Sequence, residues 1–254
     1  KGLPALAVQL DRNRQLTIKG RIDRVDIAES DGNWFLRVVD YKSRPQNLNL
    51  SNVYYGLALQ LLVYLLVTME NWEKLTKKRP HPAGALYFPM IDPIISAKGP
   101  LDEDALNRQR MRELRMCGLI VGGKDTIRLM DSQIKSGEQS DLVAAGITRS
   151  GNPSKAMKAS VIEFEQYETL SRFLRNKLKE LAESIGSGDI RIHPYKQGTT
   201  RPCRYCSYKP VCAFDSLIDG NRYRHQKGLS EKEFWSIIEE SGLNSAPQKE
   251  RDVL

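Results

Sequence analysis

The sequence contains no long uninterrupted hydrophobic run and no recognisable secretory signal. Its most apolar stretch, residues 53–69, is interrupted by Gln60 and is shorter than the roughly 20 apolar residues that a membrane-spanning helix requires. We therefore expect a buried helix in this stretch and a cytoplasmic protein without membrane contact. The hydrophobic fraction of 40% and the mean hydropathy of −0.47 are typical of a soluble globular chain.

Cysteine is scarce, because the chain has only four and none precedes Cys117. The other three are Cys203, Cys206 and Cys212. In a reducing compartment, thiols at this close spacing favour metal ligation over disulfide bonds or three unligated cysteines. A tetrahedral zinc site or a four-iron cluster needs a fourth ligand, which these three cannot supply. The sequence therefore predicts an incomplete metal site that is empty, degraded or filled by an adventitious ion.

A carboxylate and a lysine end an otherwise apolar strand. Residues 20–26 and 34–43 predict two β-strands, and the Asp31-Gly32 pair between them suits a hairpin turn. Asp40 and Lys42 are two apart on the second strand, so the pleat points both side chains to one face. Burying charged groups destabilises a protein unless they are paired, hydrogen-bonded or bound to a metal ion. A hydrated divalent metal requires such groups, whereas a surface ion pair is the usual explanation for an isolated Asp-x-Lys.

Phosphodiester hydrolysis gives this arrangement a chemical meaning. Mg²⁺ prefers oxygen ligands and usually takes one or two protein carboxylates. Asp23 on the first strand and Asp40 on the second can supply two oxygens, and the carbonyl of Tyr41 can supply a third. Lys42 would orient the attacking water and offset charge that develops on the phosphate. Asp26 has an odd offset from Asp23, which predicts a structural role on the opposite face of the sheet.

Three motifs together resemble the RecB-type branch of the PD-(D/E)XK nucleases. They are Gly20-Arg21-Ile22-Asp23, Asp40-Tyr41-Lys42-Ser43 and Gln60-Leu61-Leu62-Val63-Tyr64. The resemblance implies that Asp23 and Asp40 are metal ligands and that Lys42 is catalytic. It also implies that Gln60 and Tyr64, which share a helix face because they are four apart, position DNA or the catalytic residues.

The resemblance covers nearly the whole chain and implies more than the site. It implies a Mg²⁺-dependent deoxyribonuclease, with Mn²⁺ as an alternative ion, that acts as an exonuclease in DNA double-strand-break repair. It also implies a partner helicase–nuclease subunit and a 4Fe–4S cluster whose fourth cysteine precedes the nuclease strands. Cys117 does not stand where the family places that ligand. Because the chain starts at Lys1, we expect a fragment in which this cluster and a preceding metal-binding helix are incomplete.

The expected fold is α/β, with a restriction-endonuclease-like mixed sheet that opens with an antiparallel meander and is flanked by helices. The meander begins at residues 4–10 and leads into a helix over 51–69, capped by Ser51 or Asn52. A loop that contains His81 follows, and then a strand over 84–95 returns to the sheet.

Two further helices are predicted in the second half of the core. Residues 102–116 form a helix that ends at Cys117 and places Arg108, Arg112 and Arg115 on one face, which could be solvated or could meet DNA. Residues 132–160 predict a hairpin or a partly mobile loop. A capping box at Ser160 and Glu163 predicts the second helix, with an apolar stripe from Tyr167 to Ile185.

The chain divides into three predicted parts: a nuclease core over residues 1–190, a cysteine-containing basic subdomain over 191–228 packed on the core, and a C-terminal helix and tail over 229–254. The net charge of +8 fits a polyanionic partner without proving one. Basic and aromatic residues alternate in the subdomain, which favours single-stranded DNA binding. The equal alternative is a loop-rich subdomain packed by its own tyrosines.

Two other functions remain open from the sequence. The first is a DNA-binding iron–sulfur staple module whose nuclease site is idle. The second is a free-standing relative of the RecB-type nucleases that acts on RNA or on recombination intermediates.

Overall fold

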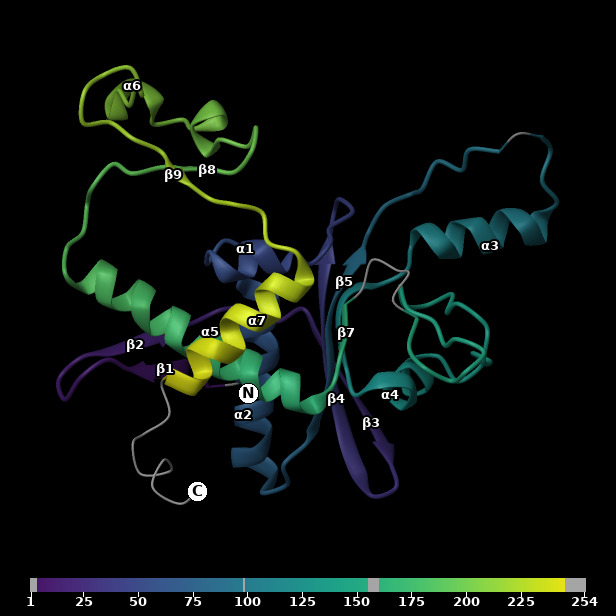
Figure 1. The fold of residues 1–254 in the computed structure, drawn as a ribbon. Coiled ribbons are helices and arrows are strands. Elements are labelled where there is room, and N and C mark those ends of the chain that lie inside the picture. The colour runs from purple at the N-terminus through teal and green to yellow at the C-terminus, as the bar shows by residue number, and fades with distance from the viewer. Residues whose placement is uncertain (1–3, 98, 155–159, 245–254) are drawn as a thin grey trace.

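A five-stranded mixed sheet forms the centre of the protein. The computed structural model describes residues 4–97, 99–154 and 160–244, and the polar tail expected after Asn244 lies outside them. The strand order is β3-β4-β5-β6-β7 (Figure 1). These strands are β3 (Arg24–Ser30), β4 (Asn33–Lys42), β5 (His81–Pro89), β6 (Cys117–Val121) and β7 (Ser160–Ile162). The expected α/β fold with a mixed sheet is confirmed.

The hairpin of β3 and β4 forms as the sequence predicts. Asp31 and Gly32 both have positive φ values, 51° and 74°, which is the conformation of the turns that best match strand twist. The strands are antiparallel, with Arg24 opposite Val39. β4 then pairs in parallel with β5, so its interior residues are buried on both faces of the sheet.

The predicted antiparallel opening is divided into two hairpins. β1 (Leu6–Gln9) and β2 (Gln15–Ile18) pair with each other in a separate two-stranded sheet. Leu6 packs with Val63 and Leu178 in a small cluster, because this hairpin covers helices instead of extending the central sheet. The strand expected over 20–26 therefore begins only at Arg24.

The helix expected over 51–69 is two helices, α1 (Leu50–Tyr54) and α2 (Gln60–Thr76). The cap of α1 is Asn49, whose side chain accepts a hydrogen bond from the Asn52 backbone, so the prediction of Ser51 or Asn52 as the cap was wrong. The chain turns between the two helices at Gly56, where φ is +78°. This break places Gln60 in the first turn of α2.

Strand β6 is absent from the sequence prediction. Helix α3 (Glu103–Glu113) ends before Arg115, which pairs with Asp141, so the expected three-arginine helix face was wrong. Cys117 does not end that helix but begins the fully buried β6. Gly118 allows β6 to pass close to β5, because a Cβ there would collide with the Ala85 carbonyl oxygen.

Two local assignments near the edges of elements also change. His81 is not a loop residue but the first residue of β5, where its ring stacks on Phe35 with centroids 5.3 Å apart. Ser160 lies in β7, and the residue that caps α5 (Phe164–Gly186) is Glu163, in a reciprocal box with Gln166.

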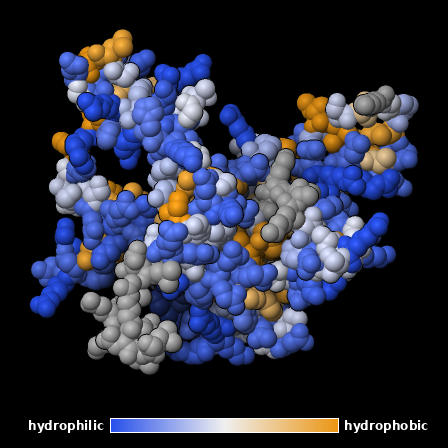
Figure 2. All heavy atoms as spheres, in the orientation of Figure 1, coloured by the Kyte–Doolittle hydropathy of each residue, from blue (hydrophilic) through white to orange (hydrophobic). Residues whose placement is uncertain are grey.

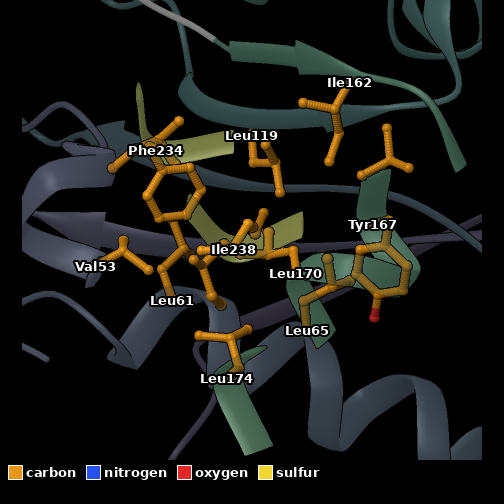
Figure 3. Close-up of a cluster of buried hydrophobic side chains, with 14 of the residues drawn as sticks. Val53, Leu61, Leu65, Leu119, Ile162, Tyr167, Leu170, Leu174, Phe234 and Ile238 are labelled. Carbon is orange, nitrogen blue, oxygen red and sulfur yellow. The ribbon is translucent and has the colours of Figure 1, made fainter. Parts of the chain in front are cut away.

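The two faces of the sheet carry different hydrophobic clusters. Helices α1, α2, α5 and α7 (Glu231–Asn244) cover one face, and Figure 3 shows Phe234 and Ile238 of α7 within that cluster. The apolar stripe of α5 enters it through Tyr167, Leu170 and Leu174, as predicted, but its expected last members, Leu181 and Ile185, are exposed. Helix α4 (Gly123–Met130) and the irregular segment up to residue 147 cover the other face. A reciprocal box of Ser230 and Glu233 caps α7.

The cysteine-containing subdomain stands away from the sheet (Figure 1). Its few elements are β8 (Tyr195–Lys196), η1 (Pro202–Tyr205), α6 (Lys209–Cys212) and β9 (Arg224–His225). Figure 2 shows hydrophobic surface on this subdomain and over the arm that carries α3. In the part of the chain that the structure describes, no helix is long and apolar enough to cross a membrane.

Replacing Phe234 with alanine tests the contribution of α7 to the core. Phe234 is 0% exposed, so we expect Phe234→Ala to lower the free energy of unfolding by about 3–5 kcal/mol. Urea denaturation followed by circular dichroism measures the change. Tyr208→Ala is the control, because Tyr208 is 74% exposed and its loss should change stability by less than about 0.5 kcal/mol. Equal losses in the two variants would contradict this assignment.

Candidate active site

A buried carboxylate lies near the C-terminal end of β4. Asp40 is 4% exposed, and its Oδ2 atom is 2.5 Å from Nζ of Lys42. Both side chains point to the sheet face that α2 covers, as their spacing of two predicts. The same Oδ2 atom is buried and accepts no directed hydrogen bond from a described residue, so the contact with Lys42 is an ion pair without hydrogen-bond geometry. A buried carboxylate oxygen in this state fits a cation ligand.

Asp23 lies beside Asp40, immediately before β3. Its Oδ2 atom accepts a hydrogen bond of 3.0 Å from the backbone N–H of Tyr41. The carbonyl of Lys42 accepts from Met90 on the β5 side, and backbone groups of a strand alternate between its two neighbours. The Tyr41 peptide groups therefore point to the side of β4 where Asp23 lies. Asp23 and the Tyr41 peptide group thus lie on the same side of β4, next to the strand position of Asp40, and the metal-ligand roles of Asp23, Asp40 and the Tyr41 carbonyl stay predictions.

Gln60 and Tyr64 extend the site along α2. Lys42 Nζ donates to Oε1 of Gln60 at 3.4 Å, and Nε2 of Gln60 donates to the Tyr64 hydroxyl at 3.0 Å. The structure thus joins Asp40, Lys42, Gln60 and Tyr64 in one continuous chain of contacts. Gly20 lies close to this chain of contacts, because a Cβ there would be only 3.0 Å from the Tyr64 ring.

The donor set of the candidate site is small. Among the described residues, no group of three or more His, Cys, Asp or Glu side chains is placed to hold a metal ion. The site at Asp23 and Asp40 offers two carboxylates and needs carbonyl and water oxygens to complete a coordination shell. This composition fits Mg²⁺, which keeps several waters, better than it fits zinc.

Asp26 has the structural role that its offset predicts. It lies on the opposite sheet face and accepts hydrogen bonds from Arg24 at 2.6 Å and from Arg37 at 2.7 Å. Burial raises the pKa of Asp26, but the hydrogen bonds and charges of the two arginines outweigh burial and leave the pKa below its usual value. The carboxylate is therefore ionised and paired at neutral pH.

Tyr87 is a neighbour of the site that sequence reasoning missed. It lies on β5 opposite Asp40 in the parallel register, and its ring centroid is 5.7 Å from Lys42 Nζ. Burial, together with the nearby charge of Asp40, raises the pKa of Tyr87 to about 12, so the phenol is neutral at physiological pH. Only the register between β4 and β5 reveals this contact, and no motif in the sequence specifies that register.

The three cysteines of the subdomain do not fit a complete metal site. Cys203 and Cys212 are half-buried and Cys206 is exposed, and a four-ligand site requires one more donor. Cys117 does not provide it, because its thiol is buried in β6 and donates to the carbonyl of Gln46. This agrees with the expectation that Cys117 is not the fourth ligand.

A basic hollow of about 890 Å³ lies in the same subdomain. Four cationic side chains line it, and the rings of Phe214 and Tyr223 meet edge to face with centroids 4.9 Å apart. The cations are Lys196, Arg201, Arg204 and Lys209. Tyr205 and Tyr208 are 84% and 74% exposed, so these two tyrosines do not pack the subdomain, whereas the Phe214–Tyr223 pair does.

Comparisons with known proteins agree with these observations. The family described as the PD-(D/E)XK nuclease superfamily matches residues 3–213. Curated relatives are named as one subunit of an ATP-dependent helicase/deoxyribonuclease. The relative from Clostridium kluyveri is 37% identical over 236 residues, which cover 93% of this chain and 20% of the relative. The relative from Desulforudis audaxviator is 38% identical over 238 residues, which cover 94% and 20%. The chain thus spans about one fifth of the length of these relatives.

The paired charge of Asp26 predicts a pH-dependent contribution to stability. Because its pKa is lowered in the folded protein, ionised Asp26 stabilises the fold above its unfolded pKa, and this stabilisation is lost as pH falls through the folded-state pKa. We expect Asp26→Asn to lower the free energy of unfolding by about 1–3 kcal/mol at pH 7 and by progressively less as the pH falls below the unfolded-state pKa toward pH 3. Urea denaturation of both proteins across this range measures the difference. A difference that persists undiminished at pH 3 would contradict the role of the charge.

Proposed function

The chain belongs to the PD-(D/E)XK nuclease superfamily, and from this premise we propose that it is a Mg²⁺-dependent deoxyribonuclease that hydrolyses DNA phosphodiesters. The contact chain from Asp40 through Lys42 and Gln60 to Tyr64 is the observation that supports the proposal best. Asp23 accepts a hydrogen bond from the neighbouring Tyr41 backbone. Asp40 is 4% exposed, so it does not form the surface ion pair that usually explains an isolated Asp-x-Lys, and this burial supports a functional role.

Each residue of the site has a distinct role in this proposal. Asp23, Asp40 and the Tyr41 carbonyl would hold the metal ion, which supplies positive charge at the scissile phosphate when it is bound. Lys42 holds the attacking water through its ammonium group and offsets the charge that develops on the phosphate oxygens. Gln60 keeps the lysine in place by accepting from Nζ, and Tyr64 accepts from the Gln60 amide and fixes its orientation.

The names of the relatives extend the proposal to a biological role. They describe one subunit of an ATP-dependent helicase/deoxyribonuclease, of the kind called AddB. We propose that the chain is the nuclease part of such a subunit and works beside an AddA-type helicase–nuclease subunit in the cytoplasm. There it would act as an exonuclease on one unwound single strand during double-strand-break end processing and DNA repair.

The three cysteines of the subdomain could hold an iron–sulfur cluster only with an additional ligand. Three thiolates of a 4Fe–4S cluster would come from Cys203, Cys206 and Cys212, and the fourth from outside these 254 residues. The basic hollow beside them supports the second candidate, a DNA-binding iron–sulfur module with an idle nuclease site, because it would hold a strand by its phosphates without cleaving it.

Cleavage of end-labelled single-stranded DNA tests the first candidate against the second. With Mg²⁺ or Mn²⁺, we expect the wild-type chain to cut and both Asp40→Asn and Lys42→Ala to lose at least about a hundredfold in rate, because each removes a charge from the reacting centre. Asp26→Asn is the matched control on the same hairpin and should retain cleavage.

The remaining outcomes separate the alternatives. Metal-independent binding of DNA by the wild type without cleavage would favour the binding module. Cutting that survives both substitutions would show that the site assignment is wrong. Preferential cutting of labelled RNA of the same sequence would favour the RNA-directed alternative.

Metal binding can be measured separately from cleavage. An ion that binds only the folded protein stabilises it by about 2.7 kcal/mol at a hundred times its dissociation constant, which is roughly 5–10 °C in Tm for a chain of this size. We expect Mn²⁺ to raise the Tm of the wild type and of Asp26→Asn but not that of Asp23→Asn or Asp40→Asn. Equal shifts in all four proteins would place the ion elsewhere.

A further inference from the structure

Lys42 has three partners at the end of β4, and they differ in charge. Asp40 attracts its ammonium as an anion at 2.5 Å. The Gln60 amide oxygen accepts from it at 3.4 Å, and the ring of Tyr87 lies 5.7 Å from it. Only Asp40 is also a candidate metal ligand. The amide of Gln60 and the ring of Tyr87 are neutral and have no proposed role in holding a metal ion.

The neutral partners matter because a divalent cation and an ammonium compete for the same carboxylate. If Asp40 held a divalent cation, the carboxylate would attract the Lys42 ammonium less strongly, because the two positive charges would repel each other. The flexible four-carbon stem of lysine then allows the ammonium to leave the site. The amide oxygen and the aromatic ring do not lose their attraction for a cation under these conditions. A ring below the ammonium therefore retains it when its ion pair weakens.

Tyr87 is held firmly enough to serve as such a ring. Its residue is 4% exposed and packs in the hydrophobic cluster between the sheet and the helices. The register that pairs Asp40 with Tyr87 places the ring on the sheet face of Asp40 and Lys42. No hydrogen bond joins its hydroxyl to another described residue, so the ring face, not the hydroxyl, makes the contact with Lys42.

We propose that Tyr87 is a positioning residue of the nuclease site, whose ring holds the Lys42 ammonium in place beside Asp40. This inference rests on the proposed function for its catalytic consequence, whereas the contact itself can be tested without cleavage. Tyr87 acts through Lys42 and does not touch the substrate.

Kinetics of three variants test the catalytic consequence. We expect Tyr87→Leu to lower kcat for single-stranded DNA by roughly five- to thirtyfold, which is the ~1–2 kcal/mol of a partly desolvated cation–π contact, with KM changed less than about twofold. Tyr87→Phe should retain kcat because it keeps the ring. Tyr167→Leu is the matched control, because it removes a buried tyrosine of the same hydrophobic cluster. Tyr167 lines a cavity beside Glu70 and Pro82, and Lys42 is not one of its neighbours there.

A double substitution shows whether Tyr87 acts through the lysine. In the Lys42→Ala background, Tyr87→Leu should cause no further loss of rate, because the group that it positions is gone. An undiminished further loss would overturn the proposal. Equal losses of kcat in Tyr87→Leu and Tyr167→Leu would also overturn it and indicate a general effect on folding.

Chemical labelling of the metal-free protein tests the contact independently of activity. We expect the modification rate of Lys42 by an amine-selective reagent at fixed pH, read by peptide mass spectrometry, to rise several-fold in Tyr87→Leu. The rate should be unchanged in Tyr87→Phe and Tyr167→Leu. An unchanged rate in Tyr87→Leu would overturn the positioning role even if the protein is a nuclease. A raised rate in a protein without Asp40-dependent cleavage would support the contact while the proposed function fails.

Discussion

The buried carboxylate of Asp40 is the constraint on which the arrangement of the sheet edge depends. A carboxylate that is 4% exposed destabilises the fold unless cations or hydrogen-bond donors compensate its lost hydration. The neighbouring groups are arranged for that purpose: Lys42 lies against its oxygen, and Gln60 and Tyr87 hold the lysine. Asp23 cannot compensate the charge of Asp40, because it is itself a carboxylate and adds a second negative charge. The edge is therefore electrostatically suited to a divalent ion.

The connection between the site and the cysteine-containing subdomain passes through α1. The hydroxyl of Ser51 in this helix is buried and accepts hydrogen bonds from the Gln197 side chain and from the Leu229 backbone. These two residues lie where the chain enters and leaves the subdomain, and α1 directly follows the loop after Lys42. The hydroxyl of Tyr55 adds a bond to the Lys227 carbonyl. The subdomain has little buried apolar surface of its own, so these polar contacts orient it relative to the site.

Much of the fold and of the site follows from local sequence patterns. The spacing of two between Asp40 and Lys42 fixes a common face in any strand, and the spacing of four between Gln60 and Tyr64 does the same in any helix. The Asp31-Gly32 turn and the apolar stripe of α5 are equally local. The structure confirms the turn and the buried part of the stripe from Tyr167 to Leu178, whereas Ile185 is exposed. The ligand roles of Asp23 and Asp40 stay predictions, supported by the burial of Asp40 and by the hydrogen bond that Asp23 accepts from the adjacent Tyr41 backbone.

The amino-acid sequence alone therefore determined the family and the periodicity of the main elements, and it predicted the candidate catalytic motif, because these depend on residues close together in the chain. Tertiary packing decided the features that depend on distant segments. Gly118 approaches Ala85 closely, which allows β6 to pair within the central sheet. The first hairpin packs on α2 and α5 and therefore does not join that sheet as the expected meander would. The parallel register that places Tyr87 beside Asp40 and Lys42 is of the same kind. These contacts depend on which hydrophobic surfaces of distant segments pack together, and the residue spacing within one segment does not specify that packing.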